Sequence, residues 1–208
     1  MDKKISLIVS VYNEQDGLRL FYTTAKKEMD KLIEAKPEYS YELIFVNDGS
    51  TDKSPEIMMR LKNDAPDNVK LIMLSRNFGH EAAMTAGLDY AEGDYLIFMD
   101  ADLQHPPASI PMIMEMFEDG HDIISMVRTK NEGSSAAGSF ASAVFYKIIN
   151  RISDANITPA ASDFFAIDKS AADVLRNNYR EKVRFLRGFV QNIGFDRTTL
   201  SYEAGARI

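Results

Sequence analysis

Two aspartates and a glutamine at alternate positions, Asp100, Asp102 and Gln104, follow a short apolar segment, residues 95–99, which predicts a buried strand. All three side chains offer oxygen donors, which suit a hard divalent cation such as Mg²⁺ or Mn²⁺ and argue against zinc. The alternative is that one aspartate ends the strand and the other begins a turn or caps the next helix. On these three residues alone the structural alternative is favoured, because Asp-x-Asp is frequent by chance.

Two earlier predicted strands also end in polar side chains. Tyr12 and Glu14 follow the first strand, where Tyr12 could stack against a nucleotide base and Glu14 could bind a base or a ribose. Asp48 follows the second strand at a glycine turn and could accept a hydrogen bond from a base N–H. Asp52, a little further on, fits a helix cap as well as a ligand contact.

Hydrophobic patterning and turn residues predict alternating strands and helices in the first part of the chain. The predicted strands are 5–12, 41–47, 69–75, 95–99 and 122–127, and the helices are 16–35, capped near Asp16, 54–64, 80–91 and 107–118. This alternation implies right-handed crossovers and a largely parallel sheet of the α/β class. Ligands of such sheets bind beyond the carboxyl ends of the strands, where all the acidic residues above are expected.

The second part of the chain has a different composition and a less regular hydrophobic pattern. Residues 128–139 are polar and contain glycine, which predicts a loop. Arg128 and Lys130 in it could cover a donor or clamp an acceptor phosphate, or could simply be solvated. Residues 140–152 carry an apolar helical stripe that could face the core or a membrane. The remaining predicted elements are a strand at 164–167, helices at 170–177 and 182–192, and a strand at 195–202.

The composition is that of an ordinary globular domain, with 45% hydrophobic and 26% charged residues among 208. A formal net charge of −7 argues against nucleic acid as a partner. The absence of cysteine excludes disulfides, thiolate metal sites and cysteine nucleophiles. No apolar stretch approaches the roughly 18 residues of a transmembrane helix, so we expect a soluble domain. Its ending at Ile208, without a cap or a tail composition, is compatible with truncation.

Four segments together resemble the family-2 glycosyltransferases of GT-A fold in order and spacing. They are Val9–Glu14, Val46–Asp52, Ser75–Glu81 and Asp100–Pro107. Within that family the chain is most similar to the polyprenyl-phosphate glycosyltransferases, which include bactoprenol glucosyltransferases and dolichol-phosphate mannose synthase. The resemblance spans nearly the whole chain. It implies one GT-A domain, with a nucleotide-sugar-binding half at 1–127 and an acceptor-side half at 128–208.

The resemblance also implies a role for each strand end. Arg76 would approach the phosphates of the donor. Asp100 would contact the ribose or sugar and join Asp102 and Gln104 around a cation that bridges the diphosphate. Such a cation neutralises charge on the departing nucleoside diphosphate, as a Lewis acid does. The residues that would hold the base and ribose are Tyr12, Glu14 and Asp48.

On the acceptor side, Asp163 matches an acidic residue that is a candidate general base in similar proteins. A lipid phosphate is already ionised near neutral pH, so Asp163 could instead orient the acceptor or the sugar, or end a turn. The arginine usual two positions on is Phe165 here, which weakens the transfer of acceptor detail. Arg184 and Arg187 match a family segment and could bind phosphate from one helical face, or be surface charges. His80 stands where many relatives have lysine, and we assign it no catalytic role.

The sequence therefore predicts a metal-dependent, inverting glycosyltransferase that moves a sugar from a UDP-sugar to a polyprenyl phosphate at the cytoplasmic face of a membrane. Membrane association would come from residues beyond Ile208, from residues 140–152 or from a partner, and a homo-oligomer is compatible with the sequence. A polysaccharide acceptor and a non-catalytic nucleotide-sugar sensor stay open as alternatives. A nucleotidyltransferase is disfavoured, because residues 9–17 lack a glycine-rich phosphate loop. The residues fix neither the sugar nor uridine over guanosine.

Overall fold

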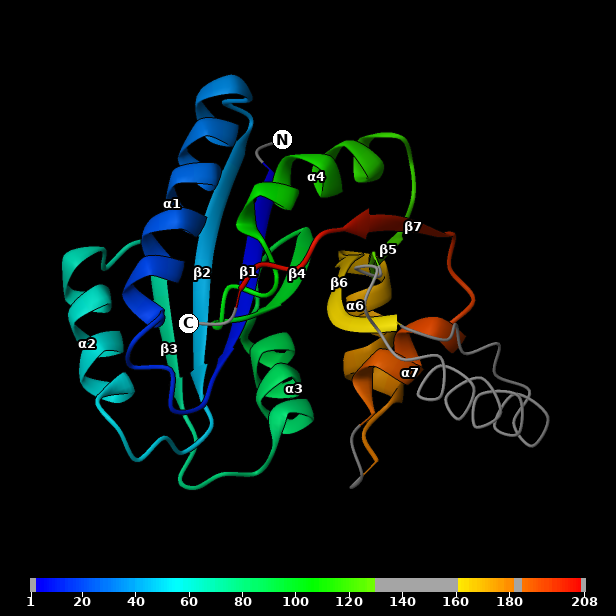
Figure 1. The fold of residues 1–208 in the computed structure, drawn as a ribbon. Helices are drawn as coiled ribbons and strands as arrows, with labels where there is room; N and C mark the ends of the chain where they lie inside the picture. The colour runs from blue at the N-terminus through cyan, green and yellow to red at the C-terminus, as the bar shows by residue number, and fades with distance from the viewer. Residues whose placement is uncertain (1–2, 130–160, 182–184, 207–208) are drawn as a thin grey trace.

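The computed structural model describes residues 3–129, 161–181 and 185–206. Among these residues, seven strands form one sheet in the order β3-β2-β1-β4-β6-β5-β7 (Figure 1). The strands are β1 Lys3–Val11, β2 Tyr39–Asn47, β3 Val69–Met73, β4 Tyr95–Asp100, β5 Ile123–Arg128, β6 Ala161–Asp168 and β7 Arg197–Tyr202. The helices are α1 Leu18–Ala35, α2 Ser54–Asp64, α3 His80–Tyr90, α4 Ile110–Glu118, α6 Lys169–Asn178 and α7 Leu186–Asn192, with a 3₁₀ turn at Pro107–Ser109 before α4.

The sheet is mainly parallel, which confirms the predicted α/β class. Strands β1 to β4 run parallel to one another, and β7 runs parallel to β5. The exception is β6, which is antiparallel to both of its neighbours, β4 and β5. Because β6 lies between two strands from the first part of the chain, the two predicted halves share one sheet. The amino end of β6 therefore lies at the same edge of the sheet as the carboxyl ends of β1, β2 and β4.

Helices cover both faces of the sheet, and the alternation of side chains along each strand explains how. In β4, Ile97 and Met99 pack with α1, α2 and α4 on one face. Leu96 and Phe98 point to the other face, where α3, α6 and α7 pack. Burial of each such side chain contributes about 1.5 to 3 kcal/mol, so both layers stabilise the strand that carries the acidic residues.

Several predicted boundaries shift. Helix α1 begins at Leu18 with Gly17 at its N-cap and no side-chain cap, so the cap expected near Asp16 is wrong. The first turn is closed instead by the Leu18 amide, which donates to the Glu14 carbonyl at 3.0 Å. Strand β3 ends at Met73, two residues before its predicted end, and the helix expected at 107–118 begins as a 3₁₀ turn. The helix expected at 140–152 lies outside the described residues.

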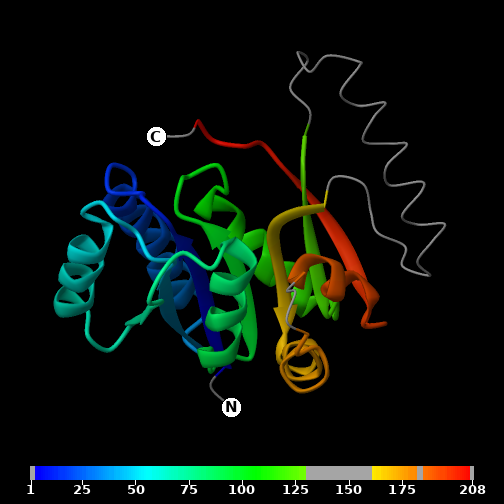
Figure 2. The same cartoon turned by 90° about the horizontal axis from the view of Figure 1, so that it is seen from below.

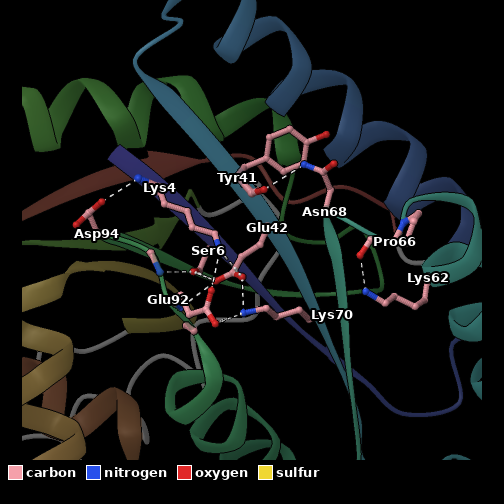
Figure 3. Close-up of polar contacts among 12 residues, drawn as sticks. Lys4, Ser6, Tyr41, Glu42, Lys62, Pro66, Asn68, Lys70, Glu92 and Asp94 are labelled. Atoms are coloured by element: carbon pink, nitrogen blue, oxygen red, sulfur yellow. Dashed lines mark hydrogen bonds and ion pairs between the residues drawn. The ribbon is translucent and has the colours of Figure 1, made fainter. Parts of the chain in front are cut away.

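At the opposite end of the sheet from the acidic residues, a buried charge network ties three strands together (Figure 3). The Glu42 side chain on β2 is 1% exposed, and the ammonium groups of Lys4 and Lys70 lie 3.0 and 2.8 Å from its Oε2. Its Oε1 accepts hydrogen bonds from the Ser6 hydroxyl at 2.6 Å and the Glu92 amide at 2.8 Å. The network joins β1, β2 and β3 to the turn that leads into β4.

Within the described part of the chain, no helix is long and apolar enough to cross a membrane.

Candidate active site

A cleft of about 140 Å³ opens at the carboxyl ends of β1 and β2. Its walls come from the end of β1, from Asp48 after β2 and from the loop that leads into α3. The lining residues are Ser10, Val11, Tyr12, Asp48, Asn77, Gly79 and His80. The cleft therefore lies where a parallel α/β sheet binds ligands, at the edge that the sequence predicted.

Asp48 is buried at 3% exposure and holds the wall of this cleft in place. One carboxylate oxygen accepts from the Phe78 amide at 2.7 Å and the other from the Gly79 amide at 2.9 Å. Gly49 brings the two loops together, because it has a φ of +68° and a Cβ there would lie 2.3 Å from the Arg76 carbonyl carbon. The structure thus shows that Asp48 holds a loop, and its contact with a nucleotide base stays a prediction.

Tyr12 and Arg76 lie at the outer part of the site. The Tyr12 side chain is 47% exposed, as a ring that stacks on an incoming base would be. The Arg76 guanidinium lies over the Phe78 ring, 3.9 Å from its centroid. Glu14, on the same loop as Tyr12, is partly buried, and its amide donates to the Ser54 hydroxyl at 2.9 Å.

Asp100, the last residue of β4, is linked to α3 through Ser10 and His80. The Ser10 hydroxyl donates to Asp100 Oδ1 at 2.9 Å, and His80 Nδ1 lies 3.0 Å from the Ser10 oxygen and 3.3 Å from Asp100 Oδ1. Because the single Ser10 proton is directed to Asp100, we assign the donated proton of the second contact to His80 Nδ1. This leaves His80 Nε2 pointing away from Asp100.

Asp163 of β6 lies on the other side of His80. His80 Nε2 is 3.9 Å from Asp163 Oδ2, and Arg187 Nη1 is 3.4 Å from Asp163 Oδ1. The register of β4 and β6 explains this meeting, because Phe98 pairs with Phe165 and the same register would set Asp100 opposite Asp163. Like charges directly opposite are destabilising, and the imidazole lies between them. The predicted donor and acceptor sides therefore meet at His80.

Glu81 fixes the approach of α7 to this cluster. Its Oε2 accepts from the Leu186 amide at 2.7 Å, at the first residue of α7. Burial raises the pKa of Glu81, opposed by that hydrogen bond and reinforced by the negative charge of Asp163. Because Arg187 follows Leu186 directly, the contact of Glu81 helps to place the guanidinium beside Asp163.

The loop after β4, residues 101–106, is called the acidic loop below. Asp102 Oδ1 accepts from the Gln104 amide at 3.0 Å, and Leu103 between them has a φ of +63°. The loop presents carboxylate and carboxamide oxygens, which fit Mg²⁺ or Mn²⁺. Within the described ranges, no three histidine, aspartate or glutamate side chains are grouped so as to hold a metal ion. A cation there would need oxygens from its ligand as well, and the metal role of Asp100, Asp102 and Gln104 stays a prediction.

The remaining predicted residues are only partly placed. Arg128 is exposed at the carboxyl end of β5, at the same edge as Asp100 but with β6 between them. Arg184 and Lys130 lie outside the described residues. Sequence reasoning gave no role to Ser10 or His80. Only their positions could have indicated a role. Ser10 is the penultimate residue of β1, which reaches the cleft, and His80 is the first residue of α3, which lies behind it.

The sheet order and the cleft define a nucleotide-sugar transferase architecture, the GT-A fold. The structure superposes with a TM-score of 0.60 and 15% identity on glucosyl-3-phosphoglycerate synthase from Mycobacterium tuberculosis, solved in complex with Mn²⁺, UDP-glucose and phosphoglyceric acid. That likeness covers 99% of this chain and 72% of the other, and at this identity it shows the fold alone.

The sequence itself gives the family. Residues 6–176 match Glycosyl transferase family 2, and the chain belongs to this family. It is 38% identical over 203 residues to the uncharacterized glycosyltransferase YkcC of Bacillus subtilis (strain 168), covering 98% of this chain and 61% of that protein. It is 33% identical over 205 residues to the bactoprenol glucosyl transferase of Shigella phage SfV, covering 99% of this chain and 64% of that protein. The chain thus spans about three fifths of the length of these curated relatives.

Proposed function

We propose that this chain transfers a sugar from a nucleoside diphosphate sugar, with uridine as the nucleoside, to a polyprenyl phosphate. The observation that carries the proposal is the meeting of Asp100 and Asp163 on the two sides of His80, at 3.3 and 3.9 Å. Asp100 ends β4, directly before the acidic loop, and Asp163 belongs to the strand expected on the acceptor side. A donor in the cleft and an acceptor beside Asp163 would then share one reaction centre.

The donor would lie in the cleft beyond β1 and β2. Tyr12 would stack on the base, Glu14 and Asp48 would hold the base and ribose, and Arg76 would approach the diphosphate. Asp100, Asp102 and Gln104 would hold Mg²⁺ or Mn²⁺, which when bound neutralises charge on the departing nucleoside diphosphate. The Asp48 carboxylate keeps the Phe78 and Gly79 amides in the cleft wall, which preorganises the binding surface before the donor arrives.

The acceptor would lie beside Asp163 and Arg187, with Arg128 and Arg184 as further phosphate contacts. A phosphate monoester needs little deprotonation near neutral pH, so Asp163 would mainly orient the acceptor oxygen for attack from the face opposite the leaving group. Arg187, 3.4 Å from Asp163, holds the carboxylate and supplies positive charge near an anionic acceptor. Direct attack of this kind inverts the anomeric carbon.

The polyprenyl acceptor is supported by the similarity to a protein named bactoprenol glucosyl transferase, which extends over 99% of this chain. Solved structures of the same fold hold UDP-glucose with Mn²⁺ or GDP-mannose with Mn²⁺, which supports a nucleoside diphosphate sugar with a cation, and titration with UDP and GDP tests the choice of uridine. We place the reaction at the cytoplasmic face of a membrane, because a polyprenyl phosphate is held in a bilayer and nucleotide sugars are water-soluble.

A transfer assay tests this proposal. The chain is mixed with radiolabelled UDP-glucose, Mn²⁺ and undecaprenyl phosphate in detergent, and label in the lipid extract is counted. We expect lipid-linked label from the wild type, and about a hundredfold slower turnover from Asp163→Asn with an unchanged UDP affinity. Turnover by Asp163→Asn equal to that of the wild type would remove Asp163 from the reaction. Label that passes to a soluble glucan, and not to the lipid, would replace the acceptor class.

A further inference from the structure

His105 is a buried histidine to which the proposed chemistry gives no role. It is 6% exposed and packs on Phe164, which lies on the face of the sheet opposite to α3. Its ring stacks on Phe164 with centroids 5.0 Å apart and planes 24° apart, and meets the Tyr202 ring edge-on at 6.0 Å. Burial lowers the pKa of His105, although the negative charge of the nearby aspartates acts to raise it. A polar ring of the acidic loop is therefore kept in an aromatic core.

His105 has a polar contact with the backbone of Asp100, and Asp100 Oδ2 lies 3.7 Å from the same ring nitrogen, Nδ1. The Asp100 amide donates to His105 Nδ1 at 3.0 Å. Asp100 pairs with Ser10 on the β1 side of β4, but the pairing of β4 with β6 on the other side ends at Phe98 and Phe165. An amide of a strand end needs an acceptor, and the imidazole supplies it. Nδ1 must be unprotonated to accept this bond, which places the ring proton on Nε2.

The same corner of the molecule is crossed by the segment after β7. Figures 1 and 2 show this segment, in red, passing from β7 to the loop that follows β4. The Gly205 amide donates to the Gln104 carbonyl at 3.3 Å, and a Cβ on Gly205 would lie 2.3 Å from the Leu103 carbonyl oxygen. His105 thus lies where the acidic loop, β6 and the end of β7 meet.

We propose that His105 is a positioning residue for the acidic loop. Its Nδ1 fixes the amide of Asp100 and its ring rests on Phe164 and Tyr202, so the Asp100 carboxylate is directed to the α3 side of the sheet. The inference deepens the proposed function, because an acidic loop held in this way is prepared for a cation and a diphosphate. The contact acts through the backbone of Asp100, and His105 touches neither donor nor acceptor.

Two variants separate the hydrogen bond from the ring packing. His105→Asn places a carboxamide oxygen close to the position of Nδ1 and removes the ring. His105→Phe keeps a ring against Phe164 and Tyr202 and removes the acceptor. For each variant, Mn²⁺-dependent UDP binding is measured by calorimetry, and exchange of the Asp100 amide proton with solvent is measured by NMR. Folding of each variant is first checked by circular dichroism.

We expect His105→Phe to lose about tenfold or more in Mn²⁺-dependent UDP affinity and to show fast exchange of the Asp100 amide. His105→Asn should keep both properties closer to those of the wild type. If His105→Phe behaves like the wild type and His105→Asn is impaired, packing of the ring alone matters and the proposal is overturned.

A measurement on the wild type covers the case in which a variant does not fold. An N–H···N hydrogen bond transmits a scalar coupling between its two nitrogens, and we expect this coupling between Asp100 N and His105 Nδ1. Its absence, together with fast exchange of the Asp100 amide, would contradict the inference. If the wild type shows the coupling but binds no UDP with Mn²⁺, the proposed function fails while the positioning of the loop stands.

Discussion

The imidazole of His80 separates two carboxylates that the strand register would otherwise set face to face. Ser10 and Asp100 lie within 3.3 Å of its Nδ1, and Asp163 lies 3.9 Å from its Nε2. At the scale of single residues, the candidate site is therefore a chain of contacts that runs from β1 through α3 to β6. Each member is fixed by a neighbour before any ligand is present, as preorganised sites require.

A substitution at Asp48 tests how this preorganisation is achieved. Asp48→Ala leaves the Phe78 and Gly79 amides without the acceptors they have now, so we expect the free energy of unfolding to fall by roughly 2 to 4 kcal/mol. Urea denaturation measures the loss. Asp48→Asn keeps one acceptor oxygen and should lose less. Equal stability of the alanine variant and the wild type would contradict the loop-holding role.

Residue types in the sequence predicted where polar groups would gather, but not how they would be used. Asp48 was expected to face a base, and the structure shows both of its oxygens engaged by backbone amides. Its partners lie 30 and 31 residues away. No local pattern reports such a contact, because it depends on the packing of one loop on another. His80 was given no role for the same reason, since its partners come from three strands.

At the scale of elements, local signals predicted the first nine strands and helices nearly at their observed positions. A short apolar run gave β4, for example, and a turn followed by a proline gave the start of α2, because both signals depend on nearby sequence. The placement of β6 between β4 and β5 could not be derived in that way. Its pairing joins segments about 70 residues apart, and the antiparallel direction breaks the alternating pattern that predicted the rest of the sheet.

The charge network at the amino end of β4 gives a test at this scale. Burial disfavours the charge of Glu42, but the Lys70 ammonium, the Ser6 hydroxyl, the Glu92 amide and the Lys4 ammonium outweigh it and hold the pKa of Glu42 below 4.5. A carboxylate with a lowered pKa contributes stability that is present above its unfolded-state pKa. That stability is lost as the pH falls through the folded-state pKa.

Glu42→Gln should therefore destabilise the fold at neutral pH by roughly 1 to 3 kcal/mol, a range reduced because Lys4 and Lys70 are partly exposed. The gap between variant and wild type should narrow below pH 4.5 as the native Glu42 takes up a proton. Glu118→Gln is the matched control, because Lys36 is as exposed as Lys4 whereas the Glu118 carboxylate is 36% exposed. Urea denaturation between pH 3 and pH 7 measures the free energy of unfolding of the wild type and of both variants. A difference between Glu42→Gln and the wild type that does not change with pH would contradict the account.

At the scale of the whole molecule, one sheet carries both sides of the candidate site. Strands β1, β2 and β4 deliver the cleft and the acidic loop, β6 delivers Asp163, and the segment after β7 returns to the acidic loop (Figures 1 and 2). Family membership and fold agree with this arrangement. The central claim that follows is that the carboxyl edge of this sheet binds a nucleoside diphosphate through a divalent cation.

Calorimetric titration of the purified chain tests that claim most directly. UDP and then GDP are titrated with Mn²⁺ present and again with EDTA, and the series is repeated with Asp102→Asn. We predict that UDP binds with Mn²⁺, binds more tightly than GDP, and loses its affinity in EDTA and in the variant. UDP binding that persists unchanged in EDTA and in Asp102→Asn, or no binding of either nucleotide by the folded wild type, would contradict the account.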